Sequence, residues 1–154
     1  MKKFFLYAGF AAVSLAAGVF LQLSFHKDFH TIDGQSGRWA DFKGDWLVIN
    51  YFAEWCAPCL KEVPELNAFH REYDIPLFAI SFDGEPDDKM RNLMTKYNMT
   101  FPVISAEPMP ELPVPKPRAL PTTYILNPDG EIQKTIQGEV THEMLFAAIE
   151  QLKQ

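Results

Sequence analysis

The chain has 154 residues, a formal net charge of −6 and an ordinary globular composition, with 47% hydrophobic and 22% charged residues. This length favours a single domain. The charge argues against nucleic-acid binding, because contacts to phosphates need clustered Lys and Arg side chains.

The N-terminal segment differs from the rest of the chain. Lys2 and Lys3 precede an uncharged, mostly apolar run from Phe4 to Leu23, and about 20 helical residues span a membrane. The run is either a secretory signal, cleaved near Ala16-Ala17-Gly18, or a retained transmembrane helix at residues 1–23. We favour the anchor, because Val19-Phe20-Leu21 extends the apolar run beyond that weak cleavage site. In both cases the lysines stay on the cytoplasmic side and the remainder is exported.

After a polar tether at residues 24–30, apolar periodicity predicts alternating strands and helices. Residues 46–52 and 76–82 are continuous apolar runs, typical of buried strands. Between them, residues 57–73 predict a helix that Pro64 kinks. Residues 86–98 predict an amphipathic helix and residues 101–105 a short strand.

The last third of the chain begins with an extended loop, because residues 108–121 contain six prolines. Residues 122–126 and 131–138 flank an Asn-Pro-Asp-Gly turn and predict a β-hairpin. Residues 141–154 predict a helix with Thr141 as its N-cap. This order predicts an α/β domain at residues 31–154, with a mixed central sheet flanked by helices, preceded by one transmembrane helix.

Both cysteines of the chain lie in one short stretch, as Cys56-Ala57-Pro58-Cys59. A bridge across so short a loop removes little entropy from the unfolded chain, so the pair suits redox exchange better than structural stabilisation. Cys56 follows a predicted strand and begins a helix, whose N–H groups and dipole favour the thiolate and lower the thiol pKa below about 8.5. Cys56 is therefore the predicted nucleophile, and Cys59, one turn later, the predicted resolving cysteine.

The run Phe-Ala-Glu-Trp-Cys-Ala-Pro-Cys at residues 52–59 resembles the active site of thioredoxin. From about Asp33 onward the chain resembles the TlpA/ResA-like branch of membrane-anchored or exported thioredoxin-like proteins, on residues 41–66, 101–104 and 120–132. The resemblance implies a thioredoxin fold and a thiol–disulfide oxidoreductase that needs no cofactor. None of the four histidines has metal-ligand spacing with the cysteines, so no metal site is predicted.

The resemblance also implies a substrate-binding loop. Pro121 is expected to follow a cis peptide bond and to pack beside the disulfide, so that Leu120 offers its backbone to a substrate peptide. Trp55 is expected to shield one flank of Cys56.

A proton acceptor is the third implied feature. Many thioredoxins carry a buried Asp six residues before the first cysteine, where this chain has Asn50, which cannot transfer protons. The TlpA/ResA-like branch instead carries a Glu three residues after the second cysteine, and Glu62 matches that position. The alternative is that Glu62 is an ordinary solvent-exposed helix residue with no role in proton transfer.

We therefore expect a monomeric protein disulfide reductase, held at the outer face of a cytoplasmic-type membrane. Its implied substrates are exported proteins, for instance the haem-attachment cysteines of apocytochrome c, and its implied electron donor is a membrane thiol transporter. Lys116 and Arg118, in the proline-rich loop, are expected to border the catalytic face and attract acidic partners, unless the loop is a rigid spacer.

Two other functions are alternatives to this one, and each conflicts with the sequence. A thiol peroxidase of the peroxiredoxin type would need a Thr where this chain has Ala53. A metallochaperone would space its cysteines by three residues rather than two.

Overall fold

The computed structural model describes residues 27–154, and within this range no helix is long and apolar enough to cross a membrane. The predicted anchor at residues 1–23 and the first residues of the tether lie outside the described part. Phe29, assigned to the tether, is buried and forms strand β1 (Phe29–His30) with its neighbour. The folded part therefore begins before Thr31.

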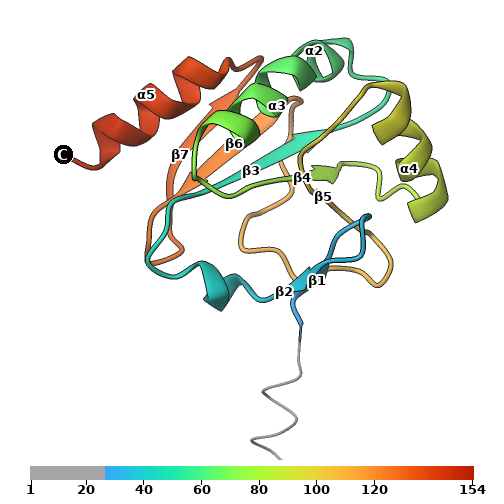
Figure 1. Cartoon of the computed structure of the whole chain (residues 1–154), viewed down its shortest axis with the longest axis horizontal. Coiled ribbons are helices and arrows are strands. Elements are labelled where there is room, and N and C mark those ends of the chain that lie inside the picture. The colour runs from blue at the N-terminus through green and yellow to red at the C-terminus, as the bar shows by residue number, and fades with distance from the viewer. Residues whose placement is uncertain (1–26) are drawn as a thin grey trace, which may run out of the picture.

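A five-stranded mixed sheet forms the centre of the fold (Figure 1). Its spatial order is β5 (Val103–Ile104), β4 (Leu77–Ser81), β3 (Leu47–Phe52), β6 (Thr122–Leu126) and β7 (Ile132–Gln137). Strands β3, β4 and β5 are parallel, whereas β6 runs antiparallel to both β3 and β7. The predicted strands and the C-terminal hairpin are confirmed. Strands β3 and β4 are buried along their whole length, as their continuous apolar runs indicated, and β6 is buried as well.

The helices follow the predicted order, with one break. Two helices, α2 (Ala57–Lys61) and α3 (Val63–Glu72), stand in place of one kinked helix. The reason is Pro64, which has no N–H to continue the helical bonding and is instead accommodated in the first turn of a new helix. The chain also forms α4 (Asp87–Lys96) and α5 (His142–Leu152), and the Thr141 hydroxyl caps α5 by accepting the N–H of Met144.

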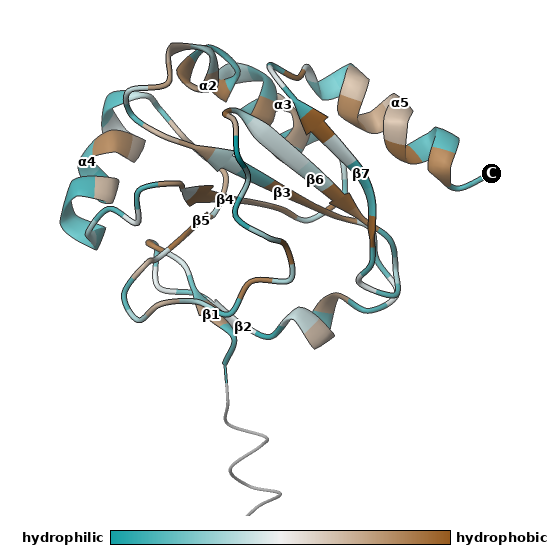
Figure 2. Cartoon of the chain, turned by 180° about the vertical axis from the view of Figure 1, so that it is seen from behind, coloured by the Kyte–Doolittle hydropathy of each residue, from teal (hydrophilic) through white to brown (hydrophobic). Residues whose placement is uncertain are grey.

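The two faces of the sheet are covered differently. Side chains of α3, α4 and α5, including Phe69, Met90 and Leu145, pack with both cysteines in one core cluster. In the second cluster, side chains of the strands such as Ile49 and Phe78 pack with Trp39 from a short 3-10 helix, η1 (Trp39–Phe42), and with Val114 from the proline-rich loop. Figures 1 and 2, seen from opposite sides, both show the α-helices on one side of the sheet, and irregular chain with β1, β2 (Ser36–Gly37) and the short helix η1 on the other.

The predicted mixed sheet with helices is confirmed. Within residues 27–154, the α-helices cover one face, and irregular chain with the short helix η1 covers the other, because the prolines of residues 108–121 prevent that segment from forming a helix while its apolar side chains still fill a core.

Candidate active site

The two cysteines lie where strand β3 leads into helix α2. Cys56 is the N-cap of α2 and Cys59 lies in its first turn, with Cα atoms 5.3 Å apart and the sulfurs joined as a disulfide. The main-chain N–H of Cys59 donates to Sγ of Cys56 at 3.3 Å. The sulfur of Cys56 therefore occupies the helix N-terminus, as predicted, where N–H groups stabilise a thiolate.

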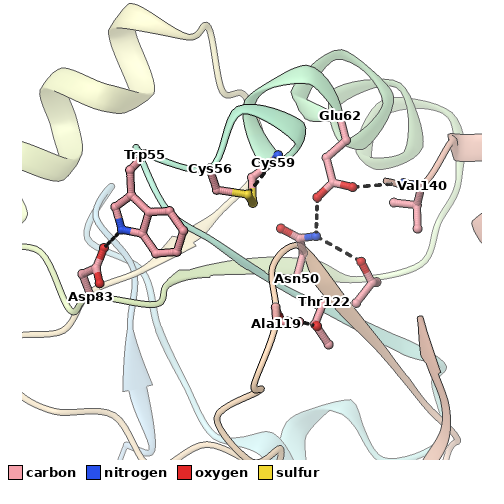
Figure 3. Close-up of a disulfide and its surroundings, with 10 residues drawn as sticks. Asn50, Trp55, Cys56, Cys59, Glu62, Asp83, Ala119, Thr122 and Val140 are labelled. Carbon is pink, nitrogen blue, oxygen red and sulfur yellow. Dashed lines mark hydrogen bonds between the residues drawn. A yellow bond between two sulfur atoms is a disulfide. The ribbon is translucent and has the colours of Figure 1, made fainter. Parts of the chain in front are cut away.

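Trp55 forms an exposed rim beside the buried disulfide, with 67% of its surface accessible to solvent. Its Nε1 donates to Oδ2 of Asp83 at 2.7 Å, and its ring meets Phe82 edge-on with 6.4 Å between centroids (Figure 3). Phe82 and Asp83 directly follow strand β4, so the ends of two parallel strands build this rim. The sequence did not single out either residue, although Phe82 ends the predicted buried strand at residues 76–82 and Asp83 follows it.

The proline-rich loop reaches the same rim. The Nζ atom of Lys116 lies 4.1 Å from the centroid of the Phe82 ring. Trp55, Phe82 and Lys116 are therefore successive contacts, which brings the loop to the side of the redox pair. Arg118, the other cation of the loop, is exposed.

The segment before β6 lies at the cysteine end of the sheet. The Leu120–Pro121 peptide bond is cis, as the resemblance implied, and so is Glu107–Pro108, which was not predicted. Thr122 is in register with Tyr51, so Pro121 lies beside the end of β3, from which the chain continues to the cysteines. Leu120 packs against the core cluster that contains both cysteines.

Glu62 lies at the break between α2 and α3, with its side chain turned into the core and only 1% exposed. Its Oε1 accepts a hydrogen bond from Nδ2 of Asn50 at 2.9 Å, and its Oε2 accepts the main-chain N–H of Val140 at 3.0 Å (Figure 3). Burial raises the pKa of Glu62 to about 7, the two hydrogen bonds oppose that rise, and the charge of Glu139 adds to it. Glu62 is therefore not a solvent-exposed helix residue, and its carboxyl group can exchange a proton near neutral pH.

Sequence reasoning missed the partners of this carboxyl group. Asn50 is a polar residue within the apolar run of β3, and such a residue needs hydrogen-bond partners when buried, so a signal existed. Val140 donates its main-chain N–H to Glu62, and no pattern of side chains in the sequence predicts such a contact.

Comparison with known proteins agrees with this geometry. A model of the AhpC/TSA family matches residues 22–135. The "Thiol-disulfide oxidoreductase ResA" of Geobacillus thermodenitrificans is 26% identical over 125 residues, an alignment covering 79% of this chain and 71% of that protein. Its namesake from Bacillus thuringiensis subsp. konkukian is 30% identical over 117 residues, covering 74% of this chain and 67% of that protein.

A solved structure shows the same likeness. The crystal structure of StoA from Bacillus subtilis matches with a TM-score of 0.62 at 28% identity, over 76% of this chain and 90% of that one. The fold is thus thioredoxin-like, with the Cys56–Cys59 disulfide at the start of a helix. Since the family model covers most of the sequence, the chain belongs to the AhpC/TSA family, and its similarity there is to thiol-disulfide oxidoreductases of the ResA type.

Proposed function

We propose that this thiol–disulfide oxidoreductase reduces disulfide bonds in exported proteins. The observation that carries the proposal is the Cys56–Cys59 disulfide at the N-terminus of α2, with the buried carboxyl group of Glu62 on the turn that follows the same helix. A nucleophile at a helix N-terminus, a second thiol one turn later and a proton acceptor are the groups that disulfide exchange requires.

The reaction follows from these roles. In the reduced chain the Cys56 thiolate attacks one sulfur of a substrate disulfide, and the other substrate sulfur leaves as a thiolate and takes up a proton. Cys59 then loses its proton to Glu62 and attacks Sγ of Cys56, which releases the second substrate thiolate. This thiolate takes the proton that Glu62 received from Cys59, and the first thiolate took its proton from solvent. The substrate thus gains two electrons and two protons, and the chain is left with the Cys56–Cys59 disulfide. A thiol donor must reduce that disulfide before the next cycle.

Substrate contacts are assigned to the groups around the disulfide. Leu120, before Pro121, offers its backbone to an extended substrate segment as a short β-bridge. Trp55 covers the flank of the disulfide from its exposed position, held by Asp83. An unfolded or loosely folded polypeptide suits both contacts, because its backbone is free to pair.

The proposed location is the outer face of a cytoplasmic-type membrane, with residues 1–23 as a single-pass anchor. Lys2 and Lys3, ahead of an uncharged run, support this orientation. The relatives named thiol-disulfide oxidoreductases support redox chemistry on thiols. The proposed role is to keep exported thiols reduced, such as the haem-attachment cysteines of apocytochrome c. The chain acts as a monomer, and a membrane thiol transporter supplies its electrons.

Three assays on one preparation test the proposal. The reduced full-length chain is expected to reduce insulin, and Cys56→Ser is expected to abolish the rate. Turnover of hydrogen peroxide by the wild type, without insulin reduction, would support the peroxidase instead. Stoichiometric copper binding by the cysteines, again without insulin reduction, would support the metallochaperone.

A further inference from the structure

Asn50 lies in the core between the redox pair and Glu62. Along β3, Val48 and Phe52 point into the cluster that holds both cysteines, and alternation places Asn50 on the same face between them. The residue is completely buried. Figure 3 shows its amide beside the Glu62 carboxylate, with the amide oxygen on the side of the two cysteines.

The amide uses only its nitrogen. Both protons of Nδ2 have acceptors, namely Oε1 of Glu62 at 2.9 Å and Oγ1 of Thr123 at 3.0 Å. With Glu62 ionised, this orientation of the amide is the favoured one, because an ionised carboxylate has no proton to give an amide oxygen. Within residues 27–154, Oδ1 of Asn50 is one of two buried side-chain polar atoms without a hydrogen-bond partner.

An orphaned acceptor in a core needs an explanation, since nearly all buried polar atoms are bonded. The disulfide supplies one, because its sulfurs carry no hydrogen. When two electrons and two protons reduce the bond, Cys59 becomes a thiol with an S–H donor, and it lies 1% exposed in the same cluster. An S–H donor on Cys59 therefore exists only in the reduced chain and is absent from the disulfide.

We infer that Asn50 is a positioning residue whose Oδ1 accepts the S–H of Cys59 in the reduced chain while its Nδ2 holds the Glu62 carboxylate. The inference rests on the proposed function, because Cys59 must cycle between disulfide and thiol. A hydrogen bond to the thiol favours the protonated form, so Asn50 keeps Cys59 protonated while Cys56 reacts as the thiolate. The same amide holds the proton acceptor in place for the resolving step.

Few charged groups lie near this amide, so the effect of Asn50 on the pKa of Cys59 can be measured separately from theirs. The residues registered with Asn50 on the neighbouring strands are Ala79 and Thr123, neither of which carries a charge. On the helix side Glu62 faces the amide, and Glu139, which affects Glu62, is paired with Lys61 at 2.7 Å. Glu62 and Cys56 are therefore the titrating neighbours that a test must separate from Asn50.

The test measures the pKa of Cys59 in the full-length chain in detergent micelles, from the 13Cβ shift of labelled cysteine after chemical reduction. Asn50→Leu keeps the approximate volume and removes the acceptor, so it is expected to lower the Cys59 pKa by about one unit. Thr123→Val is the matched control, because it removes the other partner of Nδ2 and leaves Oδ1 in place. It is expected to leave the Cys59 pKa unchanged.

Two further results decide the inference. The shift caused by Asn50→Leu is expected to persist in a Glu62→Ala background, and its disappearance there would show that Asn50 acts only through the carboxylate. In the wild type, the 13Cγ resonance of Asn50 is expected to move on reduction, and an unchanged resonance would overturn the inference without any variant. These NMR measurements need only chemical reduction of the disulfide. A chain that fails to reduce insulin would therefore contradict the proposed function, while the role of Asn50 could still be tested.

Discussion

Glu62 is the residue whose protonation links stability to catalysis. Its carboxyl group is buried beside the redox helix, and burial raises its pKa from 4.5 to about 7. Between those values the native chain holds a proton that the unfolded chain has lost. Stability therefore falls as pH rises through this window, and the stabilising contribution is fully present only below the lower value.

Replacing Glu62 by Gln is expected to remove this dependence. Across the window the wild type should lose on the order of 3 kcal/mol of unfolding free energy relative to Glu62→Gln. Denaturant unfolding of both oxidised chains from pH 4 to pH 8 measures the difference, and other titrating groups such as His142 cancel in the comparison. Parallel curves would contradict the assigned burial of an ionisable Glu62.

The same substitution tests the role of Glu62 as proton acceptor. Glu62→Gln is expected to slow the resolving step by about 10²–10⁴-fold, because Cys59 then has no base to take its proton. Rapid-quench analysis of the mixed disulfide on Cys56 gives that rate. The control is Glu65→Gln, one turn further on and more exposed, and it should match the wild type. Equal rates for the wild type and Glu62→Gln would remove Glu62 from the mechanism.

The sequence predicts single residues well only where their neighbours are close in the chain. Cys56 and Cys59 were identifiable because two residues separate them and a strand-to-helix junction holds them. The contacts of Glu62 were not, because Asn50 lies 12 residues before it and Val140 lies 78 residues after it. Those contacts depend on packing of the whole sheet and its C-terminal helix.

At the scale of elements, the break between α2 and α3 places Glu62. Pro64 ends the helical bonding, and Glu62 becomes both the last cap of α2 and the first cap of α3. Pro64 predicted a kink at this point, but helical periodicity did not predict that the Glu62 side chain would turn into the core. The proline-rich loop is the opposite case, since composition excluded helix and strand but gave no sign that the loop would cover the second face of the sheet.

The position of the loop leads to a prediction about partners. Lys116 contacts the rim next to Trp55, so reversing Lys116 and Arg118 to Glu is expected to slow reduction of an acidic protein substrate at low ionic strength. Reduction of a small neutral disulfide should be unaffected. Lys134→Glu with Lys153→Glu changes the net charge equally at other exposed positions and serves as the control. Equal slowing by both pairs, or by neither, would leave the loop as a spacer.

At the scale of the whole molecule, the described domain gathers the groups for thiol–disulfide exchange at one end of its sheet. The disulfide with its neighbour Trp55, the residues Phe82 and Asp83 after β4, and the segment of Leu120 and Pro121 come from separate parts of the sequence and meet at the end of β3. The order of strands and helices made this end predictable, because parallel strands bring the loops that follow them to one edge.

Export of that domain is a separate prediction. Lys2 and Lys3 are expected to hold the N-terminus in the cytoplasm, with residues from Ser24 onward outside. Reporter fusions placed after Leu23 should be active only as exported proteins, and N-terminal sequencing of the membrane fraction should find the segment retained. A mature chain lacking residues 1–18 would refute the anchor and leave a soluble exported form.

The central claim is that Cys56 attacks protein disulfides and Cys59 resolves the product. The most direct measurement is capture of mixed disulfides in cells by single-cysteine variants, read by non-reducing electrophoresis. Cys59→Ser is predicted to accumulate mixed disulfides with exported proteins, because attack proceeds and resolution cannot, whereas Cys56→Ser should capture none. Equal capture by both variants would contradict the assigned roles, and capture by neither would contradict the disulfide exchange itself.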